Sequence, residues 1–370
     1  MLYLDAAATT KVAQEVYDEM IPYFMEQYGN PNSKFYELAE NAKKAIELSR
    51  KRISNLFHCD EKNIIFNSGA TEGNNTIIKG LWNYYNGFKI LTTKIEHSSI
   101  HETILYLQSL GQNIQYVKVN EFGLINMDDF ISKITNVKFV CLSWVNSELG
   151  TIQPIEQIAK ICYEKNIPLL VDATQAVGKI DINLTKLKGI SFITFSGHKI
   201  NGPKGIGCLI KRKNKQNEYY DYIPLVHGEN SINPERSGTL NVPGIVGLGK
   251  ACELAKTLAY NNIGDLKEKT IELYNMFKQM FKDRVVLNTN MEYSVAGIIN
   301  MQIKGFNNEL LLKTLSKEFA ASTGSACSNI MPSRILKEIG KNDKQISESI
   351  RISIDYSTKV AFLKNRINEK

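Results

Sequence analysis

Short apolar runs alternate with helical patterns along the chain from about residue 38 to about residue 210. Each run is bounded by turn residues, and the stretches between runs carry apolar residues at helical spacing. Buried strands that are separated by helices are typical of a mostly parallel sheet with helices on both faces. The clearest strand patterns are NIIFNS (63–68), KILTT (89–93), VKFVCLSWV (137–145), IPLLVDA (167–173), ISFITFS (190–196) and IGCLIKR (206–212). The sequence therefore predicts an α/β fold, in which ligands gather at the carboxyl ends of the strands.

The pattern changes after the stretch SGTLNVPG, which occupies residues 237–244. Residues 244–260 and 266–281 have the apolar spacing of long amphipathic helices. The segments that follow alternate between strand and helix patterns, and they include SIRISID at residues 349–355. This second half predicts a smaller α+β domain beside the sheet.

Composition narrows the class of protein. The chain has 370 residues, of which 43% are hydrophobic and 22% are charged, as in ordinary soluble globular proteins. The net charge of +7 is spread along the chain, and the densest basic run, at 210–217, is better explained as a solvated hairpin tip or edge than as a nucleic-acid site. No aromatic-rich RNA-binding strand, zinc finger or basic heptad accompanies this run, so we expect no nucleic-acid partner. We also expect no membrane association, because the sequence has no pattern of a signal peptide or of a membrane-spanning run.

The cysteines and histidines add two expectations. The six cysteines are scattered without CxxC pairs, which suits a reducing cytoplasm. His97 and His101 have the spacing of a metal-binding pair on a helix. They lack the glutamate of an HExxH motif and an obvious third ligand, so we expect no metal site.

Four strand ends carry polar residues where a buried strand would otherwise stop. The SGAT turn at 68–71 leads into a helix whose N-terminus can bind an anion, although these residues are also common caps. His97 can stack on a flat ring, shuttle a proton or merely cap a helix. Asp172 ends an almost wholly apolar strand, where a carboxylate needs a cationic partner such as a protonated ring nitrogen, or serves as a cap.

Lys199 completes this set, since it lies 27 residues after Asp172, one βαβ unit further along the chain. An amine held among apolar walls and near another cation has a lowered pKa, which frees it as a nucleophile for a carbonyl group. An anion site, an acidic partner for a ring nitrogen, a stacking histidine and an imine-forming lysine together predict a pyridoxal 5'-phosphate (PLP) site.

The sequence also resembles a known family, the class V aminotransferase-like PLP enzymes, and within it the cysteine desulfurases of the NifS/IscS type. The resemblance runs nearly end to end. Its motifs, in chain order, are YLDAAATT, GNPNS, NSGATEGNN, EHSSI, VNSELG, VDATQAVGK, SGHKINGPKGIG, RSGTLNV, STGSACS and SIRIS. The combination of SGHK, GSAC and the later SIR distinguishes this branch from most aminotransferases.

The resemblance implies fold type I of the PLP-dependent transferases, with a large PLP-binding domain over residues 13–250 and a small domain from residues 1–12 and 251–370. It also implies a homodimer. Lys199 would hold PLP as an imine, Asp172 would pair with the ring nitrogen, and His97 would stack on the ring and assist proton transfer. The remaining implied contacts are Ala70, Thr71, Ser196 and His198 to the phosphate, Thr239 to it from a second subunit, Gln175 and Ser147 near the ring hydroxyl, and Asn146 and Arg351 to the substrate.

Cys327, within ASTGSACSNIMPS, is by the same resemblance the catalytic nucleophile. Its small, polar, loop-forming neighbours set it apart from the other five cysteines, although an incidental loop cysteine would have the same surroundings. The implied reaction converts L-cysteine to L-alanine, with Lys199 as the base and a persulfide left on Cys327. The persulfide would pass to an acceptor protein for iron–sulfur cluster assembly or for thiolation.

Three segments depart from the family pattern. Ser147 stands where many relatives have a second asparagine, and HGENSINPERSGT (227–239) lacks a glycine run. The interval from Cys327 to Pro332 is also shorter than in housekeeping bacterial members, which suggests a dedicated sulfur acceptor. The alternatives to a cysteine desulfurase are an aminotransferase or a selenocysteine lyase on the same fold, or a non-catalytic dimeric scaffold.

Overall fold

The computed structural model describes residues 1–228, 235–324 and 332–360 of the chain. Its largest element is a sheet of seven strands in the order β2-β8-β7-β6-β5-β3-β4. The strands are β2 (Ile64–Asn67), β3 (Ile90–Thr93), β4 (Ile114–Val117), β5 (Phe139–Ser143), β6 (Leu169–Asp172), β7 (Phe192–Ser196) and β8 (Gly207–Lys211). The pairs from β7 across to β4 are parallel, whereas β8 is antiparallel to both of its neighbours. The predicted mostly parallel sheet is confirmed.

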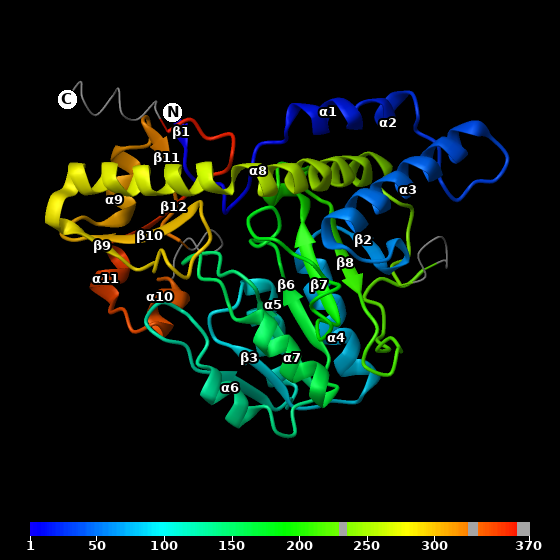
Figure 1. The fold of residues 1–370 in the computed structure, drawn as a ribbon, viewed down its shortest axis with the longest axis horizontal. Helices are drawn as coiled ribbons and strands as arrows, with labels where there is room; N and C mark the ends of the chain where they lie inside the picture. Colours follow the sequence, from blue (N-terminus) through cyan, green and yellow to red (C-terminus); the bar gives the residue numbers. More distant parts are fainter. Residues whose placement is uncertain (229–234, 325–331, 361–370) are drawn as a thin grey trace.

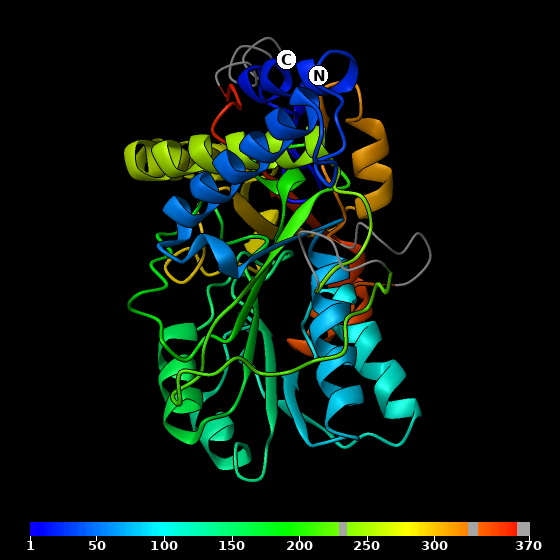
Figure 2. The ribbon, with the colours of Figure 1, turned by 90° about the vertical axis from the view of Figure 1, so that its right-hand side faces the viewer.

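Helices cover both faces of this sheet (Figure 2). On one side lie α4 (Ala70–Tyr84) and α5 (Ser98–Ser109), and on the other lie α6 (Met127–Lys133) and α7 (Ile155–Lys165). Strand β5 explains the arrangement, because its apolar side chains alternate between two cores. Phe139 and Cys141 pack with the residues beneath α4 and α5, while Val140 and Leu142 pack with the residues beneath α7.

The N-terminal helices pack against one long helix. They are α1 (Gln14–Met20), α2 (Pro22–Met25), α3 (Glu37–Phe57) and α8 (Val242–Phe281). The two helical stretches expected after residue 240 are one continuous helix, α8, which extends along both lobes of the molecule (Figure 1). Its first half packs against α1 and α3, and Leu266 and Phe277 in its second half belong to a separate core.

The second lobe surrounds that separate core. Its three-stranded antiparallel sheet places β10 (Ile298–Ile303) between β9 (Val285–Leu287) and β12 (Ser349–Ser353). The first strand of the chain, β1 (Leu2–Tyr3), pairs in parallel with β11 (Phe319–Ala320) in the same lobe. The remaining helices are α9 (Asn308–Thr314), α10 (Arg334–Glu338) and α11 (Asp343–Ser347), and short 3-10 helices occupy Glu61–Asn63, Gly197–Lys199 and Lys282–Arg284. Helix α8 is continuous through residue 250, where the boundary between the two domains is expected. That boundary stays a prediction.

The packing of α3 generates a stability prediction. Ile53 is fully buried between α3 and its neighbours, whereas Leu48 in the same helix is 47% exposed. Ile53→Ala should lower the free energy of unfolding by about 2–5 kcal/mol, because it leaves a cavity in the core. Leu48→Ala should change it by only about 0.5 kcal/mol. Urea titrations followed by circular dichroism measure both values, and equal losses would contradict the assigned packing.

Candidate active site

A cavity of about 440 Å³ lies where the carboxyl ends of β5, β6 and β7 face the N-terminal segment and the second lobe. Every predicted site residue except two lines it: Ala70, Thr71, His97, Asn146, Ser147, Asp172, Gln175, Ser196, His198, Lys199 and Arg351. Thr239 is exposed and is not part of the lining, and its expected role in a second subunit stays a prediction. Cys327 lies outside the described residues.

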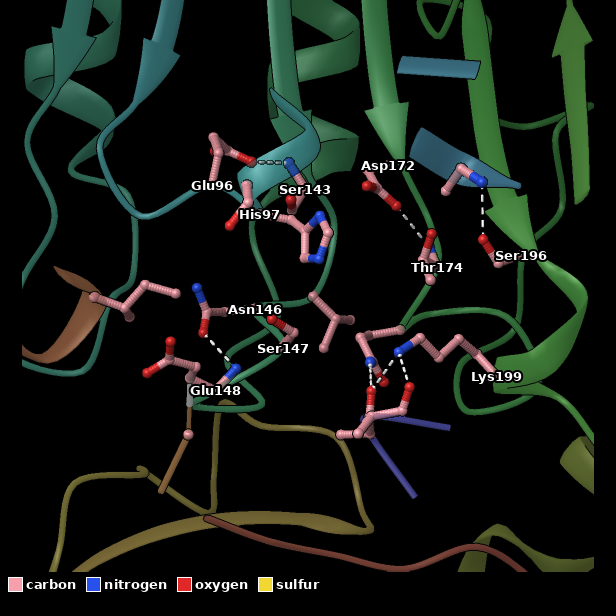
Figure 3. Close-up of a pocket in the computed structure, with 18 of the residues that line it drawn as sticks. Glu96, His97, Ser143, Asn146, Ser147, Glu148, Asp172, Thr174, Ser196 and Lys199 are labelled. Carbon is pink, nitrogen blue, oxygen red and sulfur yellow. Dashed lines mark hydrogen bonds between the residues drawn. The ribbon is translucent and has the colours of Figure 1, made fainter. Parts of the chain in front are cut away.

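Asp172 is the buried acid of the cavity. It is the last residue of β6, and its carboxylate accepts hydrogen bonds from the Asn74 side chain at 2.8 Å and from the Thr174 backbone at 3.0 Å. Asp172 is expected to pair with a protonated ring nitrogen or to act as a cap, and both roles stay predictions. It organises the turn after β6, and it also presents a carboxylate to the cavity (Figure 3).

His97 caps a helix, which is one of the three roles left open for it, whereas ring stacking and proton transfer stay predictions. It is the N-cap of α5, where its Nδ1 accepts a hydrogen bond from the backbone N–H of Ser99 at 3.1 Å, and it also lines the cavity. Burial lowers the pKa of His97. The Asp172 carboxylate opposes this shift, and the positive charges of Lys199 and Arg334 add to it. We infer that the imidazole is neutral near pH 7.

Lys199 lies directly after β7, in the 3-10 helix Gly197–Lys199. Its ammonium donates to the carbonyl oxygens of Ala7 and Ala8, each at 2.6 Å, so the N-terminal segment forms one wall of the site. The preceding His198 contacts Thr9 through Nδ1 at 3.1 Å. Burial lowers the pKa of His198 to about 4, and the charge of Lys199 contributes to this shift. His198 is therefore a neutral neighbour of the lysine.

Gln175 connects this wall to a second lysine that the sequence pattern did not single out. Its side-chain nitrogen donates to the Ala7 carbonyl at 2.8 Å, and its oxygen accepts from Lys179 at 2.7 Å. Burial lowers the pKa of Lys179 to about 7, and the charge of Lys199 adds to the effect. Lys179 also lines a second cavity of about 430 Å³ beside α8. A lysine after a Val-Gly pair resembles an ordinary surface residue, so the sequence carried no signal for this position.

The N-terminus of α4 closes another side of the cavity. The helix begins at Ala70, whose backbone N–H donates to the Ser196 hydroxyl at 2.8 Å, and no side chain caps it. Gly69 has φ of +151°, a region that favours glycine. A Cβ on Gly207 would lie 2.5 Å from the Cα of Gly69, so this position of β8 also requires glycine. The result is a backbone-lined hollow at the positive end of a helix dipole.

Arg351 reaches the cavity from β12 in the second lobe. Its Nη2 forms an ion pair with Asp5 at 2.8 Å, and its Nη1 donates to the carbonyl oxygens of Ser147 and Gly324 at 3.0 and 3.2 Å. Its Nε is buried and has no hydrogen-bond partner among the described residues. A guanidinium held in this way is suited to a carboxylate ligand.

The side-chain amide of Asn146 makes its hydrogen bonds within the protein. The amide nitrogen donates to the Ile95 carbonyl at 3.0 Å, and the oxygen accepts from the backbone N–H groups of Glu148 and Leu149, both at 2.9 Å. Asn146 therefore shapes the turn that presents Ser147 to the cavity, and its expected contact with substrate stays a prediction.

Three further lining residues were missed by sequence reasoning. Glu96 accepts hydrogen bonds from Thr93 and from the Ser143 backbone, both at 2.6 Å, and burial raises its pKa to about 7. Glu148 accepts from Ser333, and burial raises its pKa. Arg334, the first residue of α10, donates to the Glu96 carbonyl at 2.6 Å. Charged residues at helix and loop boundaries usually face solvent, so only the fold reveals that these are enclosed.

A family model supplies the decisive comparison, because the Aminotransferase class-V model matches residues 2–361. The chain belongs to the class-V aminotransferase family. Cysteine desulfurase IscS of Buchnera aphidicola (subsp. Baizongia pistaciae) is 39% identical over 95% of this chain and 87% of its own length. A solved NifS-like protein superposes with a TM-score of 0.90 at 29% identity, covering 100% of this chain and 97% of the other. The solved structure of SspA in complex with cysteine has a TM-score of 0.84 at 31% identity, covering 96% and 99%. These relatives confirm the resemblance to cysteine desulfurases.

Class-V aminotransferase-like cysteine desulfurases use PLP, and the residues of this cavity fit that cofactor. The hollow at the start of α4 suits a phosphate, Asp172 suits a protonated ring nitrogen, and Lys199 supplies the amine. The volume of about 440 Å³ is within the usual range of small-molecule sites, roughly 300–1,000 Å³. Gly207 allows β8 to pack closely against the turn at Gly69 that begins α4.

Along the described part of the chain, no helix has both the length and the apolar character needed to cross a bilayer. Over the same residues, no group of three or more His, Cys, Asp or Glu side chains could hold a metal ion.

Lys179 generates a prediction about pH. Its pKa falls from 10.5 to about 7 on folding, so the unfolded chain binds its proton more readily between these pH values. Stability must therefore rise with pH across that window, and Lys179→Met removes this contribution. The free energy of unfolding of the wild type, minus that of the variant, should increase from pH 7 to pH 10 in urea titrations. The matched control is Lys186→Met, which replaces an exposed lysine in the same way. A constant difference for Lys179→Met would show that its pKa is not lowered.

Proposed function

We propose that this chain is a cysteine desulfurase, which takes the sulfur of L-cysteine onto Cys327 and releases alanine. The observation that carries the proposal is the cavity that brings Lys199, Asp172 and His97 together with the guanidinium of Arg351. The IscS relative and the cysteine-bound neighbour support the same reaction and substrate. An amine, an acid, an imidazole and a carboxylate receptor around one space are the groups that amino-acid chemistry on PLP requires.

Each group has a proposed role toward the cofactor. Lys199 holds PLP covalently, Asp172 pairs with the ring nitrogen, and His97 lies against the ring. Gln175 and Ser147 contact the side of the ring that carries the hydroxyl. The phosphate is bound by Ala70, Thr71, Ser196 and His198. When bound, PLP supplies an electron sink for negative charge at the substrate Cα.

Arg351 binds the substrate carboxylate through its guanidinium, since this side chain lines the cavity. Lys199 then acts as the base that removes the Cα proton. The carbonyl oxygens of Ala7 and Ala8 accept hydrogen bonds from its amine, each at 2.6 Å, and fix its position at the wall of the cavity.

Cys327 is the proposed nucleophile. Its thiolate attacks the substrate sulfur, the carbon–sulfur bond breaks, and the electron pair of that bond stays with the carbon skeleton, which is protonated and released as alanine. The sulfur remains on Cys327 as a persulfide. The other five thiols are poor candidates, because burial raises their pKa and so disfavours the thiolate. The pKa is raised to about 12 for Cys59 and Cys162. It is raised further for Cys141, Cys208 and Cys252.

The partners are proposed on the same basis. The persulfide passes to an acceptor protein for iron–sulfur assembly or thiolation, and two chains form a homodimer in which Thr239 reaches the phosphate of the other subunit. The exposed position of Thr239, outside the cavity of its own chain, supports that arrangement. A cytoplasmic location stays a prediction.

The role of Cys327 is tested by Cys327→Ala, with Cys59→Ala as a matched control. The purified wild type with L-cysteine and a thiol reductant should release sulfide and alanine, and Cys327→Ala should lower sulfide release at least about 100-fold. Mass spectrometry should find one added sulfur atom on the Cys327 peptide of the wild type. Cys59→Ala should behave as the wild type. Equal sulfide release by Cys327→Ala would instead indicate a lyase without a protein persulfide.

The role of Arg351 is tested by Arg351→Gln, which removes the charge but keeps a hydrogen-bond donor. A lost charge-assisted hydrogen bond should lower kcat/KM for L-cysteine about 10- to 100-fold, mainly through KM. The visible absorption band of bound PLP should be retained, since Arg351 is not among the residues proposed to hold the cofactor. An unchanged KM would exclude Arg351 as the carboxylate receptor.

A further inference from the structure

A chain of hydrogen bonds joins the buried acid of the site to its histidine. The Asn74 side-chain nitrogen donates to Asp172 at 2.8 Å and to the Ser99 hydroxyl at 2.9 Å. The Ser99 hydroxyl in turn lies 2.9 Å from Nδ1 of His97. Asn74 on α4 is fully buried and Ser99 on α5 is nearly so, so these polar groups are enclosed in the protein. Buried polar groups of this kind need a defined partner for each donor.

The direction of every bond in this chain follows from its first member. An ionised carboxylate only accepts hydrogen bonds, so the amide nitrogen of Asn74, and not its oxygen, must face Asp172. The same nitrogen donates to Ser99, whose hydroxyl oxygen is then the acceptor. The hydroxyl hydrogen of Ser99 is left to donate to Nδ1 of His97, which must carry a lone pair.

The backbone independently requires the same state of His97. The backbone N–H of Ser99 donates to Nδ1 at 3.1 Å, and this bond caps the start of α5. A proton on Nδ1 would oppose both donors and would leave the backbone N–H of Ser99 without its capping acceptor. Nδ1 is therefore an acceptor twice over, and a neutral imidazole must carry its proton on Nε2.

We propose that Asn74 and Ser99 are positioning residues that transmit the charge of Asp172 to His97 and hold its imidazole as the Nε2–H tautomer. His97, whose ring extends into the cavity (Figure 3), then offers the cavity a proton donor and not a base. Removal of the Cα proton is left to Lys199. This consequence for catalysis rests on the proposed function, whereas the tautomer itself does not.

Charged groups on three different elements face His97 and influence its protonation state. Asp172 on β6 favours a protonated imidazole, while Lys199 after β7 and Arg334 on α10 disfavour it. Asp172 therefore has two opposing effects on the protonation of His97. Its charge attracts a second proton to the ring, and its hydrogen bonds through Asn74 and Ser99 keep that proton from Nδ1.

The experiment is nitrogen-15 NMR of the PLP-loaded enzyme with labelled histidine, in which His97→Gln assigns the His97 signals among those of five histidines. The wild type at pH 7–8 should show an unprotonated Nδ1 and a protonated Nε2. Ser99→Ala removes one of the two donors to Nδ1 and should shift the tautomer ratio toward Nδ1–H by about fivefold to tenfold. It should also move the acidic limb of the pH profile of kcat/KM toward higher pH. Asn74→Ala should shift the ratio in the same direction, since it leaves the Ser99 hydroxyl free to rotate.

Two controls separate this effect from loss of structure. Ser99→Thr keeps the hydroxyl and should restore the wild-type ratio, and Ser109→Ala at the far end of α5 should leave it unchanged. An Nδ1–H signal in the wild type, or a Ser99→Ala spectrum identical to it, would overturn the proposal. An Nε2–H signal in a wild type that does not desulfurate cysteine would support the proposal and contradict only the function.

Discussion

The Asp172 carboxylate is buried at the end of β6, and within the described residues it has no ion-pair partner within 4.0 Å. A buried charge is costly unless donors or a cation compensate it. The Asn74 amide and the Thr174 backbone N–H are the two donors that the fold provides. This requirement fixes how α4 must rotate above the sheet, because Asn74 has to reach the strand end. Asp172 also lines the cavity, where we propose that its carboxylate pairs with the protonated ring nitrogen of the cofactor.

A second constraint is that residues from both lobes form the site. Arg351 extends from β12, yet its guanidinium is held by Asp5 and by the carbonyl oxygen of Ser147 from the large lobe. The N-terminal segment makes the reverse connection, since it begins as β1 in the small lobe and then supplies the carbonyl groups that contact Lys199. A shift between the lobes would therefore disturb the positions of both the proposed carboxylate receptor, Arg351, and the proposed base, Lys199. The long helix α8, which packs into both cores, opposes such a shift.

The sequence predicted what depends on local pattern and chain order. Alternating strands and helices specify a parallel sheet, and a parallel sheet necessarily brings the residues that follow its strands to one edge. Asp172 and Lys199 could be placed in one cavity for that reason. The sequence could not predict Asn74, Ser99 or Lys179, because a polar residue on a helix or after a turn is usually solvated. Their burial depends on how the helices rotate against the sheet, and packing over long sequence distances decides that rotation. The joining of two helical stretches into α8 is a similar case, since local spacing does not show whether a helix continues.

Burial acts on the ionisable groups around the cavity in a consistent direction. It lowers the pKa of His97, His198 and Lys179, and it raises the pKa of Glu96 and Glu148. Each shift favours the neutral form, so the wall of the cavity carries less charge than its composition suggests. A small zwitterionic substrate in such an enclosure interacts strongly with the few groups that stay charged, because little solvent screens them. Arg351, which is held by Asp5 and lines the cavity, is the group that we propose orients the substrate by its carboxylate.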